Sequence, residues 1–260
     1  MIGVRSVWLG LGTVLTVATL FVALAGVWEL AADAERPSEN TQGTLPFDGG
    51  ALTVEVVGGD VNLWLMPGDA GRVMVDRVLQ WSAAKPVVKE EWDGGKLRLI
   101  LTCPGGERSG EPLCQVDYRL GVPPETAVQA SIQRGSIDAR WIYGALRLTT
   151  VSGDIRVSDT PATVWARTGT GSVNAHGLRG DSADVEVGTG QVSLSFEQTP
   201  RQVRAVVRAD GDAHVNLPDR GPYAVDTKGR NIDVNVDRDA NSPRKILVHT
   251  FDGDVTIAHW

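Results

Sequence analysis

Residues 146–157, LRLTTVSGDIRV, contain the pattern that decides the fold. Apolar residues occupy every second position on both sides of a Ser-Gly-Asp turn: Leu146 and Leu148 before it, Ile155 and Val157 after it. Alternation with a period of two residues is typical of β-strands with one buried face and is incompatible with an amphipathic helix. The stretch therefore predicts two short strands joined by a tight turn.

The same unit recurs along the chain, which is typical of repeat architectures. The eight copies of its turn are VGGDV (57–61), QRGSI (133–137), VSGDI (151–155), GTGSV (169–173), GTGQV (188–192), ADGDA (209–213), KGRNI (228–232) and FDGDV (251–255). The centres of the last seven copies lie 18–23 residues apart, so the period is real but elastic.

Apolar residues return at fixed distances from the centre of each copy. Those five before it are Val54, Ala130, Leu148, Ala166, Val185, Val206, Val225 and Val248. Those two after it are Val61, Ile137, Ile155, Val173, Val192, Ala213, Ile232 and Val255. The copy centred on Gly211 departs from the pattern, because Arg204 and Arg208 occupy two further positions of its first strand. We expect this strand to be shifted or distorted.

A single strand-turn-strand unit cannot bury its apolar face alone, so successive copies must stack. We therefore expect an all-β fold, a β-solenoid or stacked β-ladder with repeats of about 18–23 residues, preceded by one N-terminal transmembrane helix. A meandering β-sandwich shows the same alternation and is the alternative. The connections between copies differ in length, and loops on a rigid scaffold are a reasonable place for a binding surface.

The N-terminal segment predicts export. Residues 7–28 contain no charged residue, and a helix of 22 residues is long enough to cross a bilayer. Arg5 precedes this run and Glu29 follows it, which favours a cytoplasmic N-terminus. Residues 1–30 are thus predicted to be a signal-anchor transmembrane helix. A signal peptide cleaved after Ala23-Leu24-Ala25, giving a secreted protein, is the alternative.

Three further segments follow the anchor. Residues 31–46 are polar and lack periodicity, which predicts a flexible tether. Residues 47–260 are expected to form an extracellular β-repeat domain on a single-pass protein of the cell membrane. Its irregular N-terminal part is residues 47–127, where Asp93-Gly94 indicates a hairpin turn, and its regular repeats are residues 128–260.

Charge argues against one class of partner. The 32 acidic and 25 basic residues give a net charge of -7, and the basic residues are scattered along the chain. Binding to a phosphate backbone needs a concentrated Lys/Arg surface, so we expect no nucleic-acid partner.

Cys103 and Cys114 are the only cysteines, and they flank a Gly/Pro/Ser-rich loop. In an exported chain, such a pair predicts a disulfide. A zinc site or a catalytic thiol is the alternative, but no His or third Cys is placed to help. We therefore expect no metal site and no cofactor.

The residue after the centre of each turn is polar in every copy: Asp60, Ser136, Asp154, Ser172, Gln191, Asp212, Asn231 and Asp254. A stacked column of such oxygen atoms suggests a calcium site. Asp, Ser and Asn are also favoured in tight turns because their side chains accept hydrogen bonds from nearby amides. The second interpretation explains the column without a metal.

Candidate site residues are few. Trp165 lies at an outward position and is the candidate for contact with a sugar or a partner. Glu186, Asp226 and Asp233 are outward carboxylates of the kind that cleaves polysaccharides in pairs, but their spacing singles out no pair. The chain has no GxSxG, no HExxH and no phosphate-binding loop, so no catalytic residue is assigned.

The succession CQVDYRLGVP at 114–123, followed by the turns RGSIDA, VSGDIRV, TGSVNA and TGQVSL, resembles the bacterial putative-adhesin domain family of unknown function. Members of that family often follow an N-terminal signal or anchor. The likeness covers most of residues 47–260. It implies a stacked β-repeat fold and a surface location, and it implies no ligand or catalytic residue.

We therefore expect a noncatalytic, membrane-anchored, adhesin-like surface module that binds an envelope polymer or another surface protein. An accessory or regulatory envelope protein that acts on membrane neighbours is the alternative, and a β-helix enzyme active on polysaccharide is a third. The last repeat ends at residues 258–260 with no cap after it, so self-association through a C-terminal sheet edge is also expected.

Overall fold

The computed structural model describes residues 19–22, 37–81, 84–104 and 114–259. Its two compact units are Met1–Ser38 and Glu39–Trp260, and the second contains all the strands apart from the first residue of β1. In the first unit, residues 19–22 form a helical turn. Among the described residues, no helix is long and apolar enough to span a membrane. Most of the predicted anchor lies outside those residues, so the anchor stays a prediction.

The second unit is built from strands alone. In chain order they are β1 (Ser38–Pro46), β2 (Ala51–Val57), β3 (Asp60–Pro67), β4 (Arg72–Trp81), β5 (Val87–Asp93), β6 (Lys96–Thr102), β7 (Cys114–Val122), β8 (Ala127–Arg134), β9 (Ile137–Arg140), β10 (Leu146–Ser152), β11 (Ile155–Ser158), β12 (Val164–Thr170), β13 (Val173–Leu178), β14 (Ser182–Thr189), β15 (Val192–Phe196), β16 (Gln202–Asp210), β17 (Ala213–Leu217), β18 (Ala224–Lys228), β19 (Ile232–Asn235), β20 (Lys245–Asp252) and β21 (Val255–His259).

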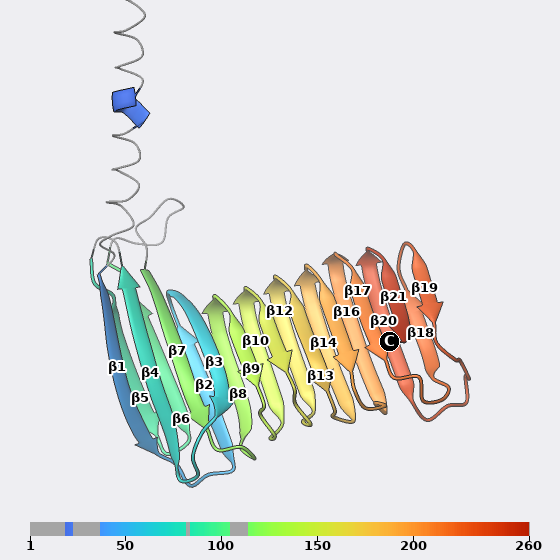
Figure 1. Ribbon diagram of the computed structural model, residues 1–260, viewed down its shortest axis with the longest axis horizontal. Coiled ribbons are helices and arrows are strands. Elements are labelled where there is room, and N and C mark those ends of the chain that lie inside the picture. The colour runs from blue at the N-terminus through green and yellow to red at the C-terminus, as the bar shows by residue number, and fades with distance from the viewer. Residues whose placement is uncertain (1–18, 23–36, 82–83, 105–113, 260) are drawn as a thin grey trace, which may run out of the picture. The chain divides into compact units, whose positions relative to one another are not determined.

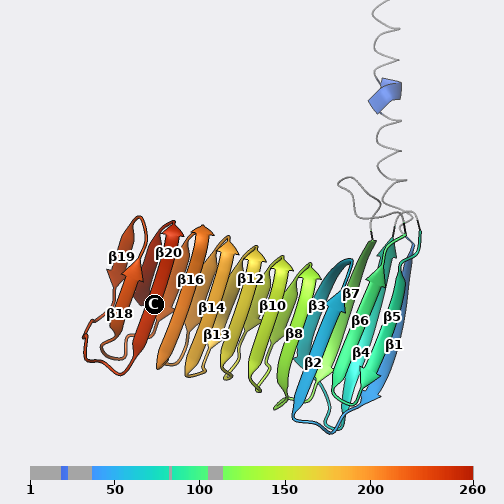
Figure 2. The ribbon, with the colours of Figure 1, turned by 180° about the vertical axis from the view of Figure 1, so that it is seen from behind.

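The strands form two sheets that face each other (Figures 1 and 2). One has the order β1-β4-β7-β3-β9-β11-β13-β15-β17-β21-β19, and the other β18-β20-β16-β14-β12-β10-β8-β2-β6-β5. The two strands of each repeat lie in different sheets, and each pairs in parallel with its counterpart in the next repeat. This is the expected β-solenoid, and it is not the meandering sandwich, in which consecutive strands pair antiparallel.

The 18-residue step keeps apolar side chains in register between coils. In one sheet Leu148 pairs with Ala166 and Ala166 with Val185, and all three are buried. In the coil centred on Gly211, the residue paired with Val185 is Ala205 rather than Val206, and the register shifts between Val207 and Asp210. The expected distortion is therefore confirmed, and it is a β-bulge. The prediction that the residue five before the centre is in the core is wrong by one position in this copy.

Glycine at the turn lets neighbouring coils approach closely. Gly153 has φ +142°, a conformation that L side chains rarely adopt. A Cβ atom added to it would lie 1.6 Å from the carbonyl oxygen of Gly135 in the preceding coil. Gly171 stands in the same relation to Gly153, at 2.2 Å. The turn column therefore needs glycine for both backbone conformation and space.

Each end of the solenoid has a coil out of sequence order. At the C-terminal end, β20 and β21 are inserted between the coil β16/β17 and the coil β18/β19, so β21 pairs with strands on both sides. The expectation that the last repeat forms an open edge is therefore wrong, because the copy at 228–232 covers it. The free edges at this end are β18 and β19.

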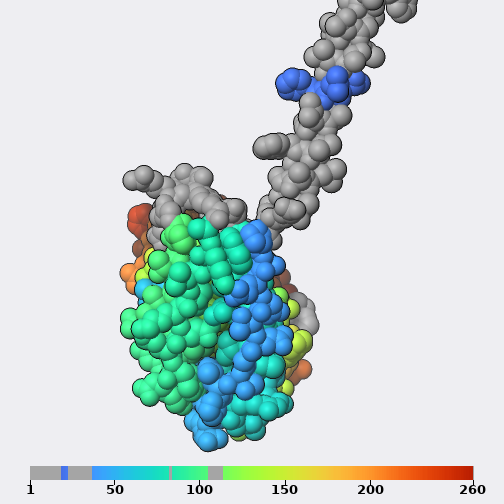
Figure 3. All heavy atoms as spheres, turned by 90° about the vertical axis from the view of Figure 1, so that its left-hand side faces the viewer, coloured from blue at the N-terminus to red at the C-terminus, as the bar shows by residue number. Residues whose placement is uncertain are grey.

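The N-terminal end mirrors this arrangement. The coil β2/β3 lies between β8/β9 and β6/β7, so the segment expected to be irregular contains two regular coils. Beyond them, β5 and β6 form the expected hairpin at Asp93-Gly94, and β1 pairs with β4. Residues 38–46 are thus a strand rather than part of a flexible tether, because they satisfy the backbone groups of an otherwise open edge. Figure 3 faces this end, with β1 in blue.

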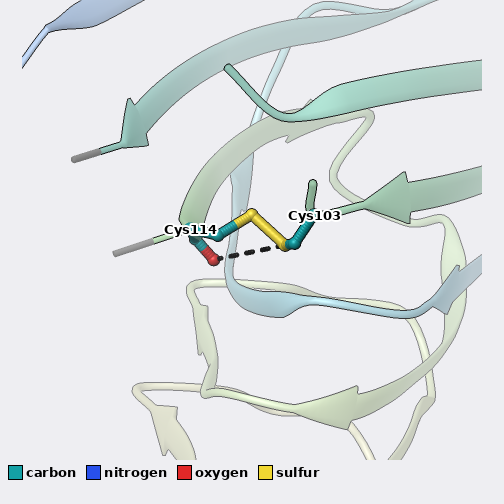
Figure 4. Close-up of a disulfide and its surroundings, with 2 residues drawn as sticks. All are labelled: Cys103 and Cys114. Carbon is teal, nitrogen blue, oxygen red and sulfur yellow. Dashed lines mark hydrogen bonds between the residues drawn. A yellow bond between two sulfur atoms is a disulfide. The ribbon is translucent and has the colours of Figure 1, made fainter. Parts of the chain in front are cut away.

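The two strands of the coil β6/β7 are joined by the disulfide. Cys103 and Cys114 are bonded, with their Cα atoms 6.0 Å apart, which confirms the pairing expected from the sequence (Figure 4). The sulfur of Cys103 also lies 3.9 Å from the carbonyl oxygen of Cys114. This is a van der Waals contact, since a disulfide sulfur has no hydrogen to donate.

Candidate functional site

A second column of special backbone conformations lies six residues after the turn glycine, at or just after the end of the second strand of a coil. Trp141, Asp159 and Gly177 have φ values of 53°, 56° and 64°. The amide of Trp141 donates to the carbonyl of Ser158 at 3.1 Å, and the amide of Asp159 donates to that of His176 at 3.0 Å. These three positions are therefore stacked corners of successive coils, and the fold requires a left-handed residue at each.

The three residue types differ in how easily they adopt this corner conformation. Glycine adopts this conformation at no steric cost, and Asp is one of the residues enriched there. A bulky residue such as Trp is an outlier, with a cost of about 1–2 kcal/mol. The Trp141 side chain is also 51% exposed, so it contributes little to the core. Strain of this kind, at an exposed aromatic residue, points to a role outside folding.

Two hollows lie beside Trp141 on the outer surface of the first sheet, where β3, β9, β11 and β13 are successive neighbours. The larger has a volume of about 490 Å³ and is lined by Trp64, Leu65, Met66, Pro67, Asp138, Arg140 and Trp141. The smaller, of about 190 Å³, is lined by Asp138, Arg140, Trp141, Arg156, Ser158, Asp159, Asn174 and His176. Because they share three residues, we treat them together as the Trp141 groove.

A planar ion pair forms part of the boundary between the two hollows. The guanidinium of Arg140 donates two hydrogen bonds to Asp138, from Nε to Oδ1 and from an Nη to Oδ2, both 2.8 Å long. Asp138 is buried, while the side chain of Arg140 is about half exposed. The hydrogen bonds and charge of Asp138 raise the pKa of Arg140, and the charge of Asp159 adds to this, so the guanidinium stays charged.

The rest of the groove is also fixed by neighbouring charges. Arg156 donates to Asp154 at 3.0 Å. The guanidinium carbon of Arg119 lies 5.4 Å from the ring centroid of Trp64, which is within the range of a cation–π contact. The groove is therefore a pre-organised surface, apolar on the β3 side and polar on the β13 side.

Trp165, the candidate from the sequence, is outward as expected but is already engaged. The guanidinium carbons of Arg147 and Arg167 lie 3.7 and 4.3 Å from the centroid of its ring. It borders a third hollow of about 320 Å³ on the other sheet, together with Thr53, Gln129 and Arg147. The ring surface that a sugar would need is occupied by cations, so contact through Trp165 stays a prediction with weaker support.

The three candidate carboxylates are not brought together. Glu186 and Asp226 lie on β14 and β18 of the same sheet, with β16 and β20 between them, and Asp233 lies on β19 of the other sheet. Three strand spacings correspond to about 14 Å. Pairs of carboxylates that cleave glycosides lie about 5–9.5 Å apart. These three residues therefore do not form such a pair.

Glu186 is instead the centre of a charge cluster. It accepts hydrogen bonds from Arg204, at 3.1 Å, and from Arg208, and Arg167 lies 3.9 Å away. Burial alone would raise the pKa of Glu186, but the hydrogen bonds from Arg208 and Arg204 and the charge of Arg167 hold it below its ordinary value. The group is thus kept as a carboxylate and cannot supply a proton near neutral pH.

The polar turn column forms hydrogen bonds between coils. Asp154 accepts from the amide of Ser172 at 2.9 Å, and Asp212 accepts from the amide of Asp254 at 2.8 Å. Asn231 donates to the carboxylate of Asp254 at 2.8 Å. These side chains therefore bond to the neighbouring coil, rather than to amides of their own turn as the turn interpretation expected. Within the described ranges, no group of three or more His, Cys, Asp or Glu could hold a metal ion.

Trp141 is a site residue that was not predicted from the sequence, although a signal for it exists. Residues six after the glycines at 135, 153 and 171 are Trp141, Asp159 and Gly177. Asp and Gly at two of the three positions indicate a left-handed corner, at which Trp is out of place. The column was not compared because it falls outside the apolar alternation that identified the strands.

The stacked coils define this protein as a two-sheet β-solenoid. The chain belongs to the Toastrack DUF4097 family, whose model matches residues 127–258. No curated protein matches the sequence.

Several solved structures are similar to this chain at a low level. A "putative cell adhesion protein" from Clostridium sporogenes is 14% identical, with a TM-score of 0.40 over 86% of this chain and 100% of that one. A "putative lipid binding protein" from Parabacteroides distasonis is 10% identical, with a TM-score of 0.42 over 85% of this chain and 97% of that one. A "putative adhesin" from the same species is 10% identical, with a TM-score of 0.40 over 84% and 97%. Similarity this low assigns no function to this chain.

Proposed function

We propose that the protein is a noncatalytic, adhesin-like surface module that binds an envelope polymer or another surface protein through the Trp141 groove. The observation that carries this proposal is the placement of a half-exposed Trp at a corner that favours glycine. A side chain kept at a cost to folding is expected to serve binding or another function. The groove beside it is concave and combines apolar with polar groups, as ligand sites do.

The assignment as noncatalytic rests on the state of the carboxylates. Asp138 is held in a bidentate pair with Arg140, and Glu186 is bonded to arginines that keep it ionised. Because its pKa is lowered, Glu186 is not available as a general acid, which needs a pKa near the working pH. Both oxygens of Asp138 are occupied by hydrogen bonds from Arg140. A rigid solenoid face with paired charges is better suited to recognition than to proton transfer.

We further propose that the domain lies outside the cell, on a single-pass membrane protein with a cytoplasmic N-terminus. The uncharged run at residues 7–28 supports an anchor. The disulfide between Cys103 and Cys114 supports an oxidising compartment, because disulfides are rare in the cytosol. Secretion after cleavage of the segment is the alternative, and both routes export the solenoid.

The test is retention of envelope components by the full chain, purified in detergent and immobilised. Trp141→Ala is compared with wild type and with Tyr143→Ala, a matched control because Tyr143 is 52% exposed, close in sequence and absent from the lining of the groove. Wild type and the control are expected to retain the same polysaccharide or protein, and Trp141→Ala to retain about a tenth as much or less. Equal retention by all three, or none by wild type, would contradict the proposal.

A further inference from the structure

We infer that the ligand of the Trp141 groove is a neutral, extended glycan, with sugar rings lying in both hollows beside Trp141. The inference rests on the proposed function and names the ligand class of the same site. It follows from the aromatic side chains, the planar polar groups, the balance of charge and the shape of the groove.

The larger hollow offers aromatic surface. Trp64 and Trp141 come from neighbouring strands, β3 and the end of β9, and both line it. An indole ring presents a negative π face. The C–H bonds on one face of a pyranose ring carry a slight positive charge and pack against such a surface. Because the guanidinium carbon of Arg119 already lies 5.4 Å from the ring centroid of Trp64, Trp141 offers the ring on which a sugar would stack. Its negative π face suits a sugar better than an anion.

The smaller hollow offers hydrogen-bonding groups in fixed positions. Asn174 supplies both donors and acceptors, and Ser158 supplies a hydroxyl. The Asp138–Arg140 pair adds an acceptor and a donor side by side, with the guanidinium held flat by its two bonds to the carboxylate. Neighbouring hydroxyls of a sugar, each both donor and acceptor, match such an alternating set.

Charge separates a neutral polymer from an anionic one. The lining of the groove contains two carboxylates, Asp138 and Asp159, and two guanidinium groups, Arg140 and Arg156. A site for an anionic polymer would carry a surplus of Lys and Arg, as phosphate-binding surfaces do. The balance here gives no net attraction for either sign, which favours an uncharged ligand.

Shape and composition favour a glycan chain over a protein. Stable protein interfaces bury about 800 Å² on each partner, with a core depleted of charge. In the groove, Trp141 and the charged residues Asp138 and Arg140 line both hollows, so no part of it is free of charge. The groove crosses β3, β9, β11 and β13, a distance of about 14 Å across the sheet. This length suits several linked sugars and is too long for one.

The test is a glycan array carrying neutral and anionic oligosaccharides, probed with the full chain in detergent, followed by titration of the bound glycan. A neutral oligosaccharide is expected to bind with an affinity that changes little with salt. Trp141→Gly is expected to weaken it by about tenfold or more, and Tyr143→Ala by less than about twofold. Gly fits the left-handed corner, so this variant removes the ring without risk to folding. Asp138→Asn tests the ion pair separately.

The outcomes are distinguishable. Binding only to anionic glycans, weakening steeply with salt, overturns the neutral assignment. Retention of an envelope protein through Trp141, with no glycan bound on the array, overturns the glycan but leaves the proposed function standing. If the full chain retains neither glycan nor protein, both proposals fail.

Discussion

Replacing Gly153 by Ala tests the reason that the coils stack at the glycine turn. The substitution adds one methyl group in the middle of the solenoid. At φ +142°, the Cβ atom is strained whatever space it has, and it would lie 1.6 Å from the carbonyl oxygen of Gly135. No real Cβ contact is this short, so the two coils must separate. This movement also displaces the amide of Gly153, which donates a hydrogen bond of 2.7 Å to the carbonyl of Thr170 in the following coil.

The expected loss follows from these terms. The backbone conformation alone costs about 1–3 kcal/mol for a residue with a side chain. Separating the coils weakens hydrogen bonds between the flanking strands, each worth about 0.5–1.5 kcal/mol. Together these give a loss of about 3–5 kcal/mol in the free energy of unfolding. For a domain of this size, that lowers the midpoint of thermal unfolding by about 10 °C.

Denaturant and thermal unfolding, followed by circular dichroism, measure the loss against two controls. Gly94→Ala adds a side chain at φ +57° with nothing within 4 Å, which isolates the backbone cost. Gly50→Ala adds a methyl group in open space without a left-handed φ, and is expected to change stability by less than about 0.5 kcal/mol. The loss should be largest for Gly153→Ala. A Gly153→Ala variant as stable as Gly50→Ala would refute the reasoning.

Three further predictions concern other parts of the domain. Replacing both Cys103 and Cys114 with Ala should lower the free energy of unfolding by about 2–3 kcal/mol, measured by denaturant titration, because the disulfide closes a short loop; an unchanged midpoint would contradict this. The pKa of Glu186 is lower in the folded protein than in the unfolded chain, so on acidification the unfolded chain binds the proton first. The contribution of Glu186 to stability is therefore complete above about pH 4.3 and is lost as the pH falls through the pKa of the folded protein. Below this pH, the unfolding temperature of Glu186→Gln should therefore change less with pH than that of wild type. Parallel plots of unfolding temperature against pH for the two proteins would contradict the stabilisation of Glu186 by the arginines. Trp141→Gly should be more stable than Trp141→Ala by about 1 kcal/mol, whereas Tyr143→Gly should be less stable than Tyr143→Ala. If Ala is the more stable replacement at both positions, the corner is not strained.

The repeat made most of the solenoid predictable from sequence. Alternation around LRLTTVSGDIRV identifies two strands, and the 18-residue step places Leu148 against Ala166 because parallel coils keep equal positions in register. The bulge in β16 was visible as two misplaced arginines, Arg204 and Arg208. Local periodicity was sufficient wherever a strand pairs with the next copy in the chain.

The order of the coils at the two ends could not be predicted in this way. The coil β20/β21 lies inside β18/β19 at one end, and the coil β2/β3 lies inside β6/β7 at the other. This order depends on which sheet edges are free once the chain has turned back. The repeat pattern is the same for every neighbour and does not encode this order. Strand β1 was missed for a related reason, since an exposed edge strand has no buried face and hence no alternation.

The candidate site was predicted least well. Trp165 was favoured because it is outward, but sequence does not show that Arg147 and Arg167 contact its ring. The Trp141 groove was not predicted because it is lined by residues of β3, β9, β11 and β13, which come from different coils. Only the comparison of equal positions across copies could have indicated Trp141.

The proposal that the Trp141 groove is the binding surface is tested most directly by the indole N–H signals of the eight tryptophans in a nitrogen–proton NMR spectrum. The bound envelope component, or a fragment of it, is titrated into the labelled full chain, and signals are assigned by single substitutions. We expect the signals of Trp64 and Trp141 to move and saturate together, while those of Trp165 and of Trp92, which packs against Phe47, stay in place. Saturating binding that shifts Trp165 and leaves Trp141 unchanged would contradict it.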